Sequence, residues 1–537
     1  MGTEDQTAIV DFLGSPSTHG GMTVERIDTH SSIVFLAGAR AWKLKRAVRF
    51  DYLDFSTAVR RKLLCEAEVR LNRRTAPSLY RGVVAITRAR DGSLALGGPG
   101  EPVDWVVEMA RFDQESLLDR LAAGGRLSLD TMAALASALA RFHGGAEPQP
   151  NHGGKAGMTW VIEGNAAGFA DQGAGILDPA ACGRVTRDTR FELERQGGLL
   201  DKRRQHGSVR QCHGDLHLRN IVLLDGQPTL FDAIEFNDEI ACIDVLYDLA
   251  FLLMDLWRRQ LPSHANAIWN GYLGETNDLE GVVLMPLFLS CRAAVRAKTS
   301  ATATRVQADT RQAAELEQLA RDYLAMAERL LHPPPPRLIA IGGHSGSGKS
   351  AVAMALAPSI GAVPGAVVLR SDEIRKRLFG VQPLQRLGPE GYAPDVSGRV
   401  YVTVADRARL VVRSGHSAIV DAVHARPAAR QAIERVAAAA SVPFIGVWLD
   451  APEEVLIERA NRRRLDPSDA DETVIRTQRA QDLGVIDWHR IDASLPADAV
   501  LRNVKALVDG RDFREETASQ VAQRHDRPTV TVQLPKP

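Results

Sequence analysis

The sequence has few cysteines, no excess of charge of either sign and no long apolar run, and each absence excludes a class of protein. Its five cysteines are scattered over 537 residues without a C-x-x-C pair, which argues against a disulfide framework and against a zinc site. No apolar run reaches the roughly 18 residues of a membrane-spanning helix, and the acidic N-terminus lacks a basic segment followed by an apolar one. We therefore expect a cytoplasmic protein with no membrane partner.

The charged residues balance, with 66 lysines and arginines against 66 aspartates and glutamates. This balance does not indicate a nucleic-acid partner, although a local basic patch would be compatible with one. The chain is too long for a single hydrophobic core. Four prolines at 333–336 end a charged helical stretch and favour a stiff linker. We predict domains at 1–332 and 337–513, and a disordered tail at 514–537.

The most specific motif is G-x-x-x-x-G-K-[ST], the phosphate-binding P-loop, which begins at Gly343. An apolar strand-like run precedes it and a helix-forming run follows it, as the motif requires. Its glycines let backbone N–H groups face phosphates, Lys349 supplies a positive charge to the β- and γ-oxygens, and the Ser350 hydroxyl can hold Mg²⁺. The predicted ATP-binding residues are Gly343, Ser345, Gly346, Ser347, Gly348, Lys349 and Ser350.

Further polar residues of the second domain follow apolar runs that predict strands. Asp372 and Arg375 come after the run 366–370, and Asp421 ends the run 419–421, where a carboxylate can reach Mg²⁺ through water. Arg459 and Arg463 lie on one face of a predicted helix, before a polar loop. Paired arginines there suit the stabilisation of a phosphoryl group in transfer, and the alternative is a solvated basic face.

A second chemical motif lies near the middle of the chain. Asp215 is followed by Asn220, and a predicted hairpin then leads to Asp232. These three side chains can converge, so that one carboxylate accepts the proton of a substrate hydroxyl while the other two groups hold Mg²⁺ on ATP. Lys43 lies in the second strand of an earlier predicted hairpin, in a small lobe of strands with one helix.

The segment 213–220 matches the pattern H-G-D-x-x-x-x-N and resembles the catalytic loop of the aminoglycoside phosphotransferase and choline kinase-like families. The resemblance implies that Asp215 is the catalytic base, that Asn220 and Asp232 bind magnesium, and that Lys43 pairs with a helix glutamate and the α- and β-phosphates of ATP. Glu68 is the preferred partner of Lys43 because it shares a helix face with apolar residues, and Glu66 is the alternative. The only glycine in the hairpin before Lys43 is Gly38, so no glycine-rich phosphate loop is evident there.

The region from Gly343 to residue 471 resembles the P-loop kinases that include zeta toxins, chloramphenicol phosphotransferase and polynucleotide 5′-kinases. By that resemblance Asp372 is a base, Arg375 binds substrate, and Arg459 and Arg463 belong to a lid. The two regions in this order resemble bacterial tandem proteins described as bifunctional aminoglycoside phosphotransferase/ATP-binding proteins.

These observations predict an α+β, two-lobed protein kinase-like domain joined to an α/β P-loop NTPase domain with a parallel sheet. The expected function is ATP-dependent and Mg²⁺-dependent phosphoryl transfer at two sites, each acting on a hydroxyl of a small molecule. Two alternatives stay open. In one, the first domain is a regulatory nucleotide-binding module and only the P-loop domain is catalytic, on a small molecule or a polynucleotide 5′ end. In the other, the protein is an ATP-driven switch without an acceptor.

Overall fold

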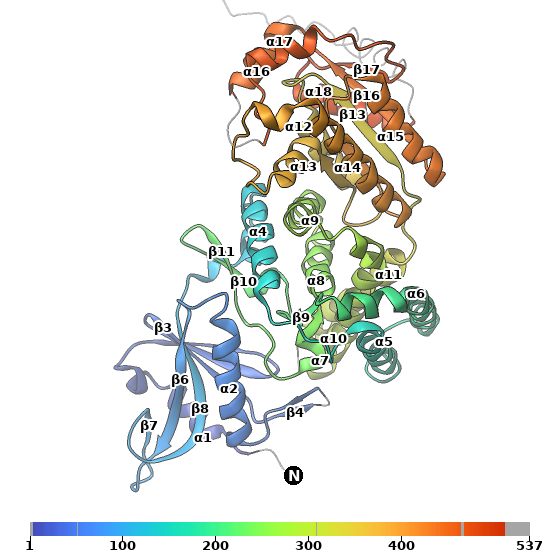
Figure 1. Cartoon of the computed structure of the whole chain (residues 1–537). Helices are drawn as coiled ribbons and strands as arrows, with labels where there is room; N and C mark the ends of the chain where they lie inside the picture. Colours follow the sequence, from blue (N-terminus) through green and yellow to red (C-terminus); the bar gives the residue numbers. More distant parts are fainter. Residues whose placement is uncertain (1–3, 51, 308, 463–466, 511–537) are drawn as a thin grey trace, which may run out of the picture. The chain divides into compact units, whose positions relative to one another are not determined.

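The computed structural model describes residues 4–510 except 51, 308 and 463–466, and it divides into two compact units, Met1–Pro333 and Pro334–Pro537 (Figure 1). The prolines at 333–336 lie in neither helix nor strand. The predicted tail at 514–537 and the predicted site residue Arg463 fall outside the described residues. Within the described ranges, no helix has both the length and the apolar character needed to span a membrane.

The first unit begins with a six-stranded antiparallel sheet in the order β1-β2-β3-β8-β6-β7. Helix α2 packs on one face through Cys65 and Val69, and helix α1 packs on the other through Ile9 and Leu13. The strands are β1 (Val24–Asp28), β2 (Ser32–Ala37), β3 (Arg40–Lys45), β6 (Tyr80–Arg88), β7 (Leu94–Leu96) and β8 (Glu101–Ala110), and the helices are α1 (Thr7–Gly14) and α2 (Ala58–Asn72). The short strands β4 (Arg49–Phe50) and β5 (Leu53–Asp54) form a separate pair.

Alternation along β2 and β3 decides which side chains reach α2. Phe35 pairs with Trp42 in the antiparallel register, and both belong to the core on the α1 face. Ala41 points to the α2 face, so Lys43, two residues further along β3, points there as well. The predicted hairpin is therefore confirmed, and it directs Lys43 toward α2.

The rest of the first unit is mainly helical. Its helices are α3 (Leu118–Ala123), α4 (Leu129–Gly145), α5 (Gly154–Asp171), α6 (Pro179–Gln205), α7 (Asp238–Ala241), α8 (Val245–Arg258), α9 (Pro262–Thr276), α10 (Met285–Val306) and α11 (Thr310–Leu330). Two short antiparallel strand pairs flank the segments that contain Asp215 and Asp232. They are β9 (Val209–Gln211) with β12 (Cys242–Asp244) and β10 (Ile221–Leu224) with β11 (Gln227–Leu230). Helix α8 is buried over almost its whole length and supports these pairs.

The second unit is an α/β domain with a five-stranded sheet in the order β14-β15-β13-β16-β17, and all of its strand pairs are parallel. The strands are β13 (Leu338–Gly343), β14 (Val367–Arg370), β15 (Ala418–Asp421), β16 (Phe444–Asp450) and β17 (His489–Asp492). Its helices are α12 (Lys349–Leu356), α13 (Ser371–Leu378), α14 (Pro394–Arg413), α15 (Pro427–Ala440), α16 (Glu453–Arg462), α17 (Glu472–Arg479) and α18 (Ala497–Val508). The carboxyl ends of all five strands lie at one edge, where ligands of such sheets bind.

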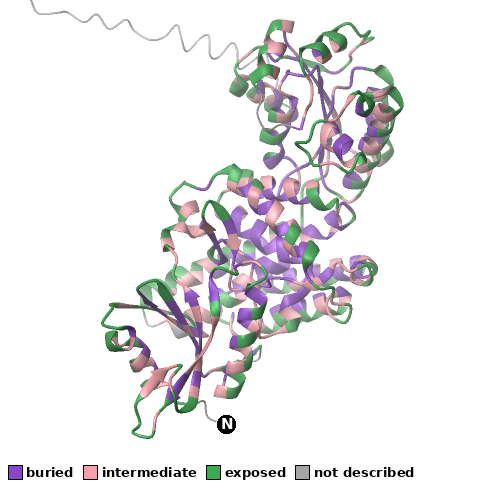
Figure 2. Cartoon of the chain, turned by 60° about the vertical axis from the view of Figure 1, so that its left-hand side comes forward, coloured by how far each residue is buried: buried purple, intermediate pink, exposed green. Residues whose placement is uncertain are grey.

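Buried residues lie mainly in the strands and helices described above (Figure 2). Strand β13 is buried at every position, with Ile339 and Ile341 in a core that includes residues of α12 and α18. The predicted fold class, a two-lobed kinase-like domain followed by a parallel P-loop domain, is confirmed. The sequence analysis did not identify β1, β17 or α1.

Candidate active sites

Asp215, the predicted base, lies in the loop between β9 and β10, and its carboxylate is held from two sides. Asn220 Nδ2 donates to Asp215 Oδ2 at 3.0 Å and to the Asp215 main-chain oxygen at 2.9 Å. His217 Nε2 lies 3.2 Å from the same Oδ2. Burial raises the pKa of Asp215, but His217, with smaller contributions from Arg296 and His213, outweighs burial and holds the pKa well below its usual range. Because the side chain is 37% exposed, an ionised carboxylate is available to a substrate hydroxyl.

Helix α8 fixes the backbone of the loop that carries Asp215. Asp248, in the first turn of α8, accepts hydrogen bonds from the backbone N–H groups of His213 at 3.1 Å and Gly214 at 2.9 Å. Asp244 caps the same helix by accepting from the Leu246 N–H at 2.9 Å. Asp248 thus fixes the backbone directly before Asp215, and Asp244 fixes the start of the helix that carries Asp248.

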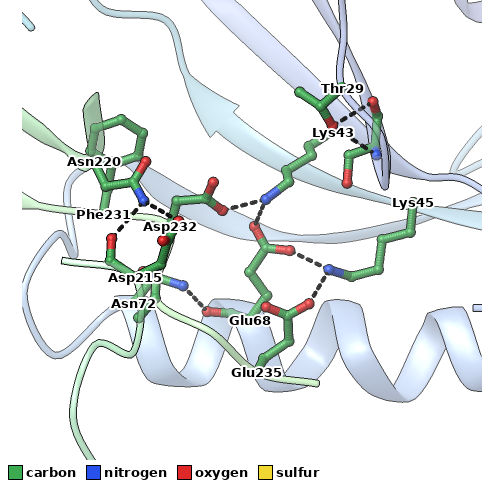
Figure 3. Close-up of polar contacts among 12 residues, drawn as sticks. Thr29, Lys43, Lys45, Glu68, Asn72, Asp215, Asn220, Phe231, Asp232 and Glu235 are labelled. Atoms are coloured by element: carbon green, nitrogen blue, oxygen red, sulfur yellow. Dashed lines mark hydrogen bonds and ion pairs between the residues drawn. The ribbon is translucent and has the colours of Figure 1, made fainter. Parts of the chain in front are cut away.

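Lys43 lies between the two acidic groups that the sequence analysis assigned to the nucleotide site (Figure 3). Its Nζ donates to Glu68 Oε1 at 2.8 Å and makes a close ion pair with Asp232. Asp232 follows β11 with a φ of 63°, a left-handed conformation that is uncommon outside glycine and often marks a functional residue. Its N–H donates to the Tyr80 hydroxyl at 3.1 Å. The structure therefore brings together three residues that are far apart in the sequence.

The choice between Glu66 and Glu68 is decided by helix geometry. Glu68 is fully buried on the face of α2 that meets the sheet. Glu66, two residues earlier, lies about 200° away around the helix axis. It is half exposed and lies 3.9 Å from Lys62. Glu68 is the partner of Lys43.

Two further residues of this cluster were missed. Lys45 Nζ donates to Glu68 Oε2 at 2.6 Å and to Glu235 Oε1 at 2.5 Å. The spacing of two residues between Lys43 and Lys45 was a usable signal, because it places both on one face of a strand. No comparable local signal marks Glu235, which arrives through the path of the chain after β11.

The P-loop of the second unit takes the shape that its glycines permit. Gly343 has a φ of 135°, and a Cβ atom there would lie 2.4 Å from the carbonyl oxygen of Leu449. Gly346 has a φ of 87°, and its Cβ would lie 2.3 Å from the Leu456 oxygen. A larger side chain at either position would strain the backbone and collide with a main-chain oxygen. Both glycines are therefore required for the loop.

The residues at the start of α12 suit Mg-ATP. Ser350 Oγ donates to Asp421 Oδ2 at 2.6 Å, and hydroxyl and carboxylate oxygens are the ligands that Mg²⁺ prefers. Asp421 reaches this position because β13 and β15 are adjacent and parallel, with Ile341 opposite Asp421. Ser347 Oγ in the loop is buried without a hydrogen-bond partner among the described residues. An orphaned donor in a glycine-lined loop at a helix N-terminus fits a phosphate group.

Asp372 and Arg375 follow β14 on the first turns of α13. Burial and the nearby Asp421 carboxylate raise the pKa of Asp372. Arg375 donates to the Gly391 oxygen at 2.7 Å and lies over the Tyr392 ring, with 4.7 Å between the guanidinium carbon and the ring centre. Asp372 is thus close enough to Asp421 for the two charges to interact, whereas Arg375 holds the segment before α14.

Of the two predicted lid arginines, the structure describes Arg459, and the contact to the P-loop comes from α17. Arg459 donates to the Ala493 oxygen at 2.7 Å, and Arg463 is outside the described residues. Instead, Gln478 of α17 contacts the P-loop at Ser345: its Oε1 accepts from the Ser345 N–H at 2.9 Å, and its Nε2 donates to Ser345 Oγ at 3.1 Å. Asp469 Oδ1 accepts a hydrogen bond from Lys376 Nζ at 2.7 Å, which is a second contact between residues far apart in the sequence.

Comparison with known proteins assigns a family to each unit. Residues 54–282 match the model of the phosphotransferase enzyme family, and residues 338–481 match an AAA domain. Uncharacterized proteins of Mycobacterium tuberculosis and Mycobacterium bovis are 30% identical to the chain over 485 residues, which is 88% of this chain and 92% of theirs. The similarity therefore extends through both units.

Solved structures also resemble the separate units. The APS kinase CysC of Mycobacterium tuberculosis, in complex with AMPPNP and APS, is 22% identical over 33% of this chain and 99% of its own, with a TM-score of 0.26. A thermostable mutant of aminoglycoside phosphotransferase APH(4)-Ia is 13% identical over 59% of this chain and 98% of its own, with a TM-score of 0.37.

Proposed function

The chain belongs to a family of two-domain proteins in which a phosphotransferase enzyme domain precedes an AAA-type P-loop kinase domain, and from this premise we propose that both domains are catalytic. Both domains belong to kinase families, so the protein is an ATP-dependent kinase. Each site would transfer the γ-phosphoryl group of ATP to a hydroxyl of its own small molecule. The observation that supports this proposal is that each unit brings together a carboxylate suited to be a base, side chains suited to hold Mg²⁺ and a buried or half-buried lysine suited to contact phosphates.

At the first site, Asn220 and Asp232 would hold Mg²⁺, and Lys43 would contact the α- and β-phosphates. Glu68 holds the Lys43 side chain in position through the 2.8 Å ion pair. Bound Mg-ATP supplies the γ-phosphoryl group and neutralises the charge that develops during its transfer. Asp215 orients the acceptor hydroxyl and takes its proton. Asn220 and His217 fix both the position and the ionised state of this carboxylate.

At the second site, Ser350 and Asp421 would hold Mg²⁺, while the P-loop N–H groups and Lys349 bind the phosphates. Asp372 is placed to accept the proton of the acceptor. Its pKa is raised by burial and by the nearby Asp421 carboxylate, which makes it a stronger base than a free aspartate. The two sites thus use different folds for the same chemistry.

The experiment that tests catalysis at the first site compares Asp215→Asn with Asp232→Asn, in full-length protein whose second site is inactivated by Lys349→Ala. Asp215→Asn removes a proton acceptor and should leave ATP affinity nearly intact, while transfer falls about 10²- to 10⁴-fold. Asp232→Asn should weaken Mg-ATP binding itself, because a metal ligand loses its charge. ATP affinity is measured by calorimetry, and transfer is measured with labelled ATP against a metabolite mixture.

Asp225→Asn is the matched control, since Asp225 is exposed in the turn between β10 and β11. It should change neither binding nor transfer. Equal loss of ATP binding in the Asp215 and Asp232 variants would mean that Asp215 is a structural carboxylate. Binding of Mg-ATP without transfer to any acceptor would favour a regulatory first domain.

A further inference from the structure

Glu68 is shared by two lysines, one on each carboxylate oxygen. Lys43 contacts Oε1 and Lys45 contacts Oε2, and both lysines come from the same face of β3. The Lys45 side chain is 1% exposed, against 13% for Lys43. Lys43 is therefore the more accessible of the two lysines, and Lys45 is enclosed by protein. Because both oxygens are held, the Glu68 carboxylate cannot rotate away from Lys43.

Lys45 also reaches the segment that carries the metal ligand. Its second partner, Glu235, lies three residues after Asp232, and Asp232 contacts Lys43. Figure 3 shows these side chains as a chain of contacts from Asp232 through Lys43, Glu68 and Lys45 to Glu235. The intervening backbone is fixed too, since the Ala233 N–H donates to Asn72 Oδ1 of α2 at 2.8 Å. The contacts form a closed ring through β3, α2 and residues 232–235.

The ring contains three carboxylates and two lysines, so the carboxylates outnumber the cations by one. The Asp232 side chain is 41% exposed, whereas the Glu68 and Glu235 side chains are almost fully buried. Burial alone raises the pKa of Glu68, but the two lysines outweigh burial and lower it to about 2. Buried carboxylates need paired cations, and Lys45 is the cation that stays beside both Glu68 and Glu235 when Lys43 leaves Asp232.

We propose that Lys45 and Glu235 are positioning residues of the first nucleotide site, which hold Glu68 in place and join it to the metal-binding segment. When a divalent cation takes Asp232, Lys43 becomes available to the phosphates while Lys45 keeps Glu68 oriented. Without Lys45, Lys43 would be the sole cation beside three carboxylates and would stay with them. This inference rests on the proposed function, in that it takes the first unit to bind Mg-ATP.

The test measures Mg-ATP affinity by calorimetry in full-length protein carrying Lys349→Ala. Lys45→Met should raise the dissociation constant about tenfold or more, because Lys43 is retained by unpaired carboxylates. The double variant Lys45→Met/Glu235→Leu removes one charge of each sign and restores the original charge balance. It should recover most of the affinity. A merely structural role predicts the opposite, since the double variant lacks two packed polar side chains instead of one.

Lys62→Met is the matched control, because Lys62 is a half-exposed lysine of the same lobe, 3.9 Å from Glu66 and, in the part of the chain that the structure describes, without a contact to the ring. It should bind Mg-ATP like the parent. Circular dichroism checks that each variant is folded; if Lys45→Met alone is unfolded, recovery of folding and binding in the double variant supports the proposal. Parental affinity in a folded Lys45→Met variant, or a double variant no better than the single one, overturns it. Failure of the parent to bind Mg-ATP at its first site overturns the proposed function as well.

Discussion

Lys349 helps to lower the pKa of two histidines near the second site. It is buried, and its Nζ donates to the His344 oxygen at 2.9 Å. Burial together with the charge of Lys349 lowers the pKa of His424 to about 3, and burial, Arg479 and Lys349 lower that of His344 to about 4. Both histidines are therefore neutral at physiological pH. The positive charge available to a phosphate group is therefore that of Lys349, together with the partial charge at the N-terminus of α12.

We predict that Lys349→Ala weakens ATP binding by the second unit about 10- to 100-fold, the effect expected when a charge-assisted hydrogen bond is lost. Calorimetry in an Asp232→Asn background isolates the second site, since the first has lost a metal ligand. Lys505→Ala, at an exposed position of α18, should have no effect. Unchanged ATP affinity in Lys349→Ala would rule out the P-loop assignment.

At the scale of elements, α17 interacts with the P-loop in a way that motif spacing does not predict. The Gln478 carboxamide oxygen accepts from the Ser345 N–H, one of the backbone donors that a P-loop offers to phosphate. A phosphate oxygen in that position would compete with Gln478 for the same donor. Gln478 of α17 is therefore placed to compete with phosphate for this N–H.

We expect Gln478→Ala to bind a non-hydrolysable Mg-ATP analogue more tightly at the second site, by about 2- to 12-fold, since a net hydrogen bond contributes roughly 0.5–1.5 kcal/mol. The measurement is again calorimetry in the Asp232→Asn background. Gln481→Ala, an exposed glutamine just beyond the same helix, serves as the control and should match the parent. Weaker binding by Gln478→Ala would show that Gln478 assists the nucleotide instead of competing with it.

At the scale of the whole molecule, each unit has a hydrophobic core of its own. The core around Ile339 and Ile341 contains residues of the second unit alone, and the cores on the two faces of the β1–β8 sheet contain residues of the first. Each unit also has its own predicted metal-binding and phosphate-binding side chains. These features are expected of domains that fold independently.

We therefore predict that a protease site replacing residues 333–336 allows cleavage into two fragments that stay folded and each bind Mg-ATP. Circular dichroism would report folding and calorimetry would report binding, with the uncleaved protein as the reference. Affinities within a few-fold of the uncleaved protein are expected. Loss of folding or of binding in either fragment after cleavage would show that the units depend on each other.

The sequence by itself determined those features that depend on neighbouring residues. The P-loop is a contiguous segment whose glycines and lysine impose its conformation, so strand, loop and helix followed in the predicted order. The same holds for residues 213–220, where Asp215 and Asn220 are close enough in the chain to hydrogen-bond directly. Two strand-like runs on either side of Gly38 likewise predicted the hairpin that contains Lys43.

The tertiary structure decided which distant side chains meet. Glu66 and Glu68 are equivalent as carboxylates, and only the packing of α2 on the sheet selects Glu68. The pairing of Lys45 with Glu235 spans 190 residues, and that of Gln478 with Ser345 spans 133. No local pattern specifies such contacts, because they depend on how separately formed elements pack together. The physical reason is that burial of apolar faces sets those positions first, and the polar contacts follow from them.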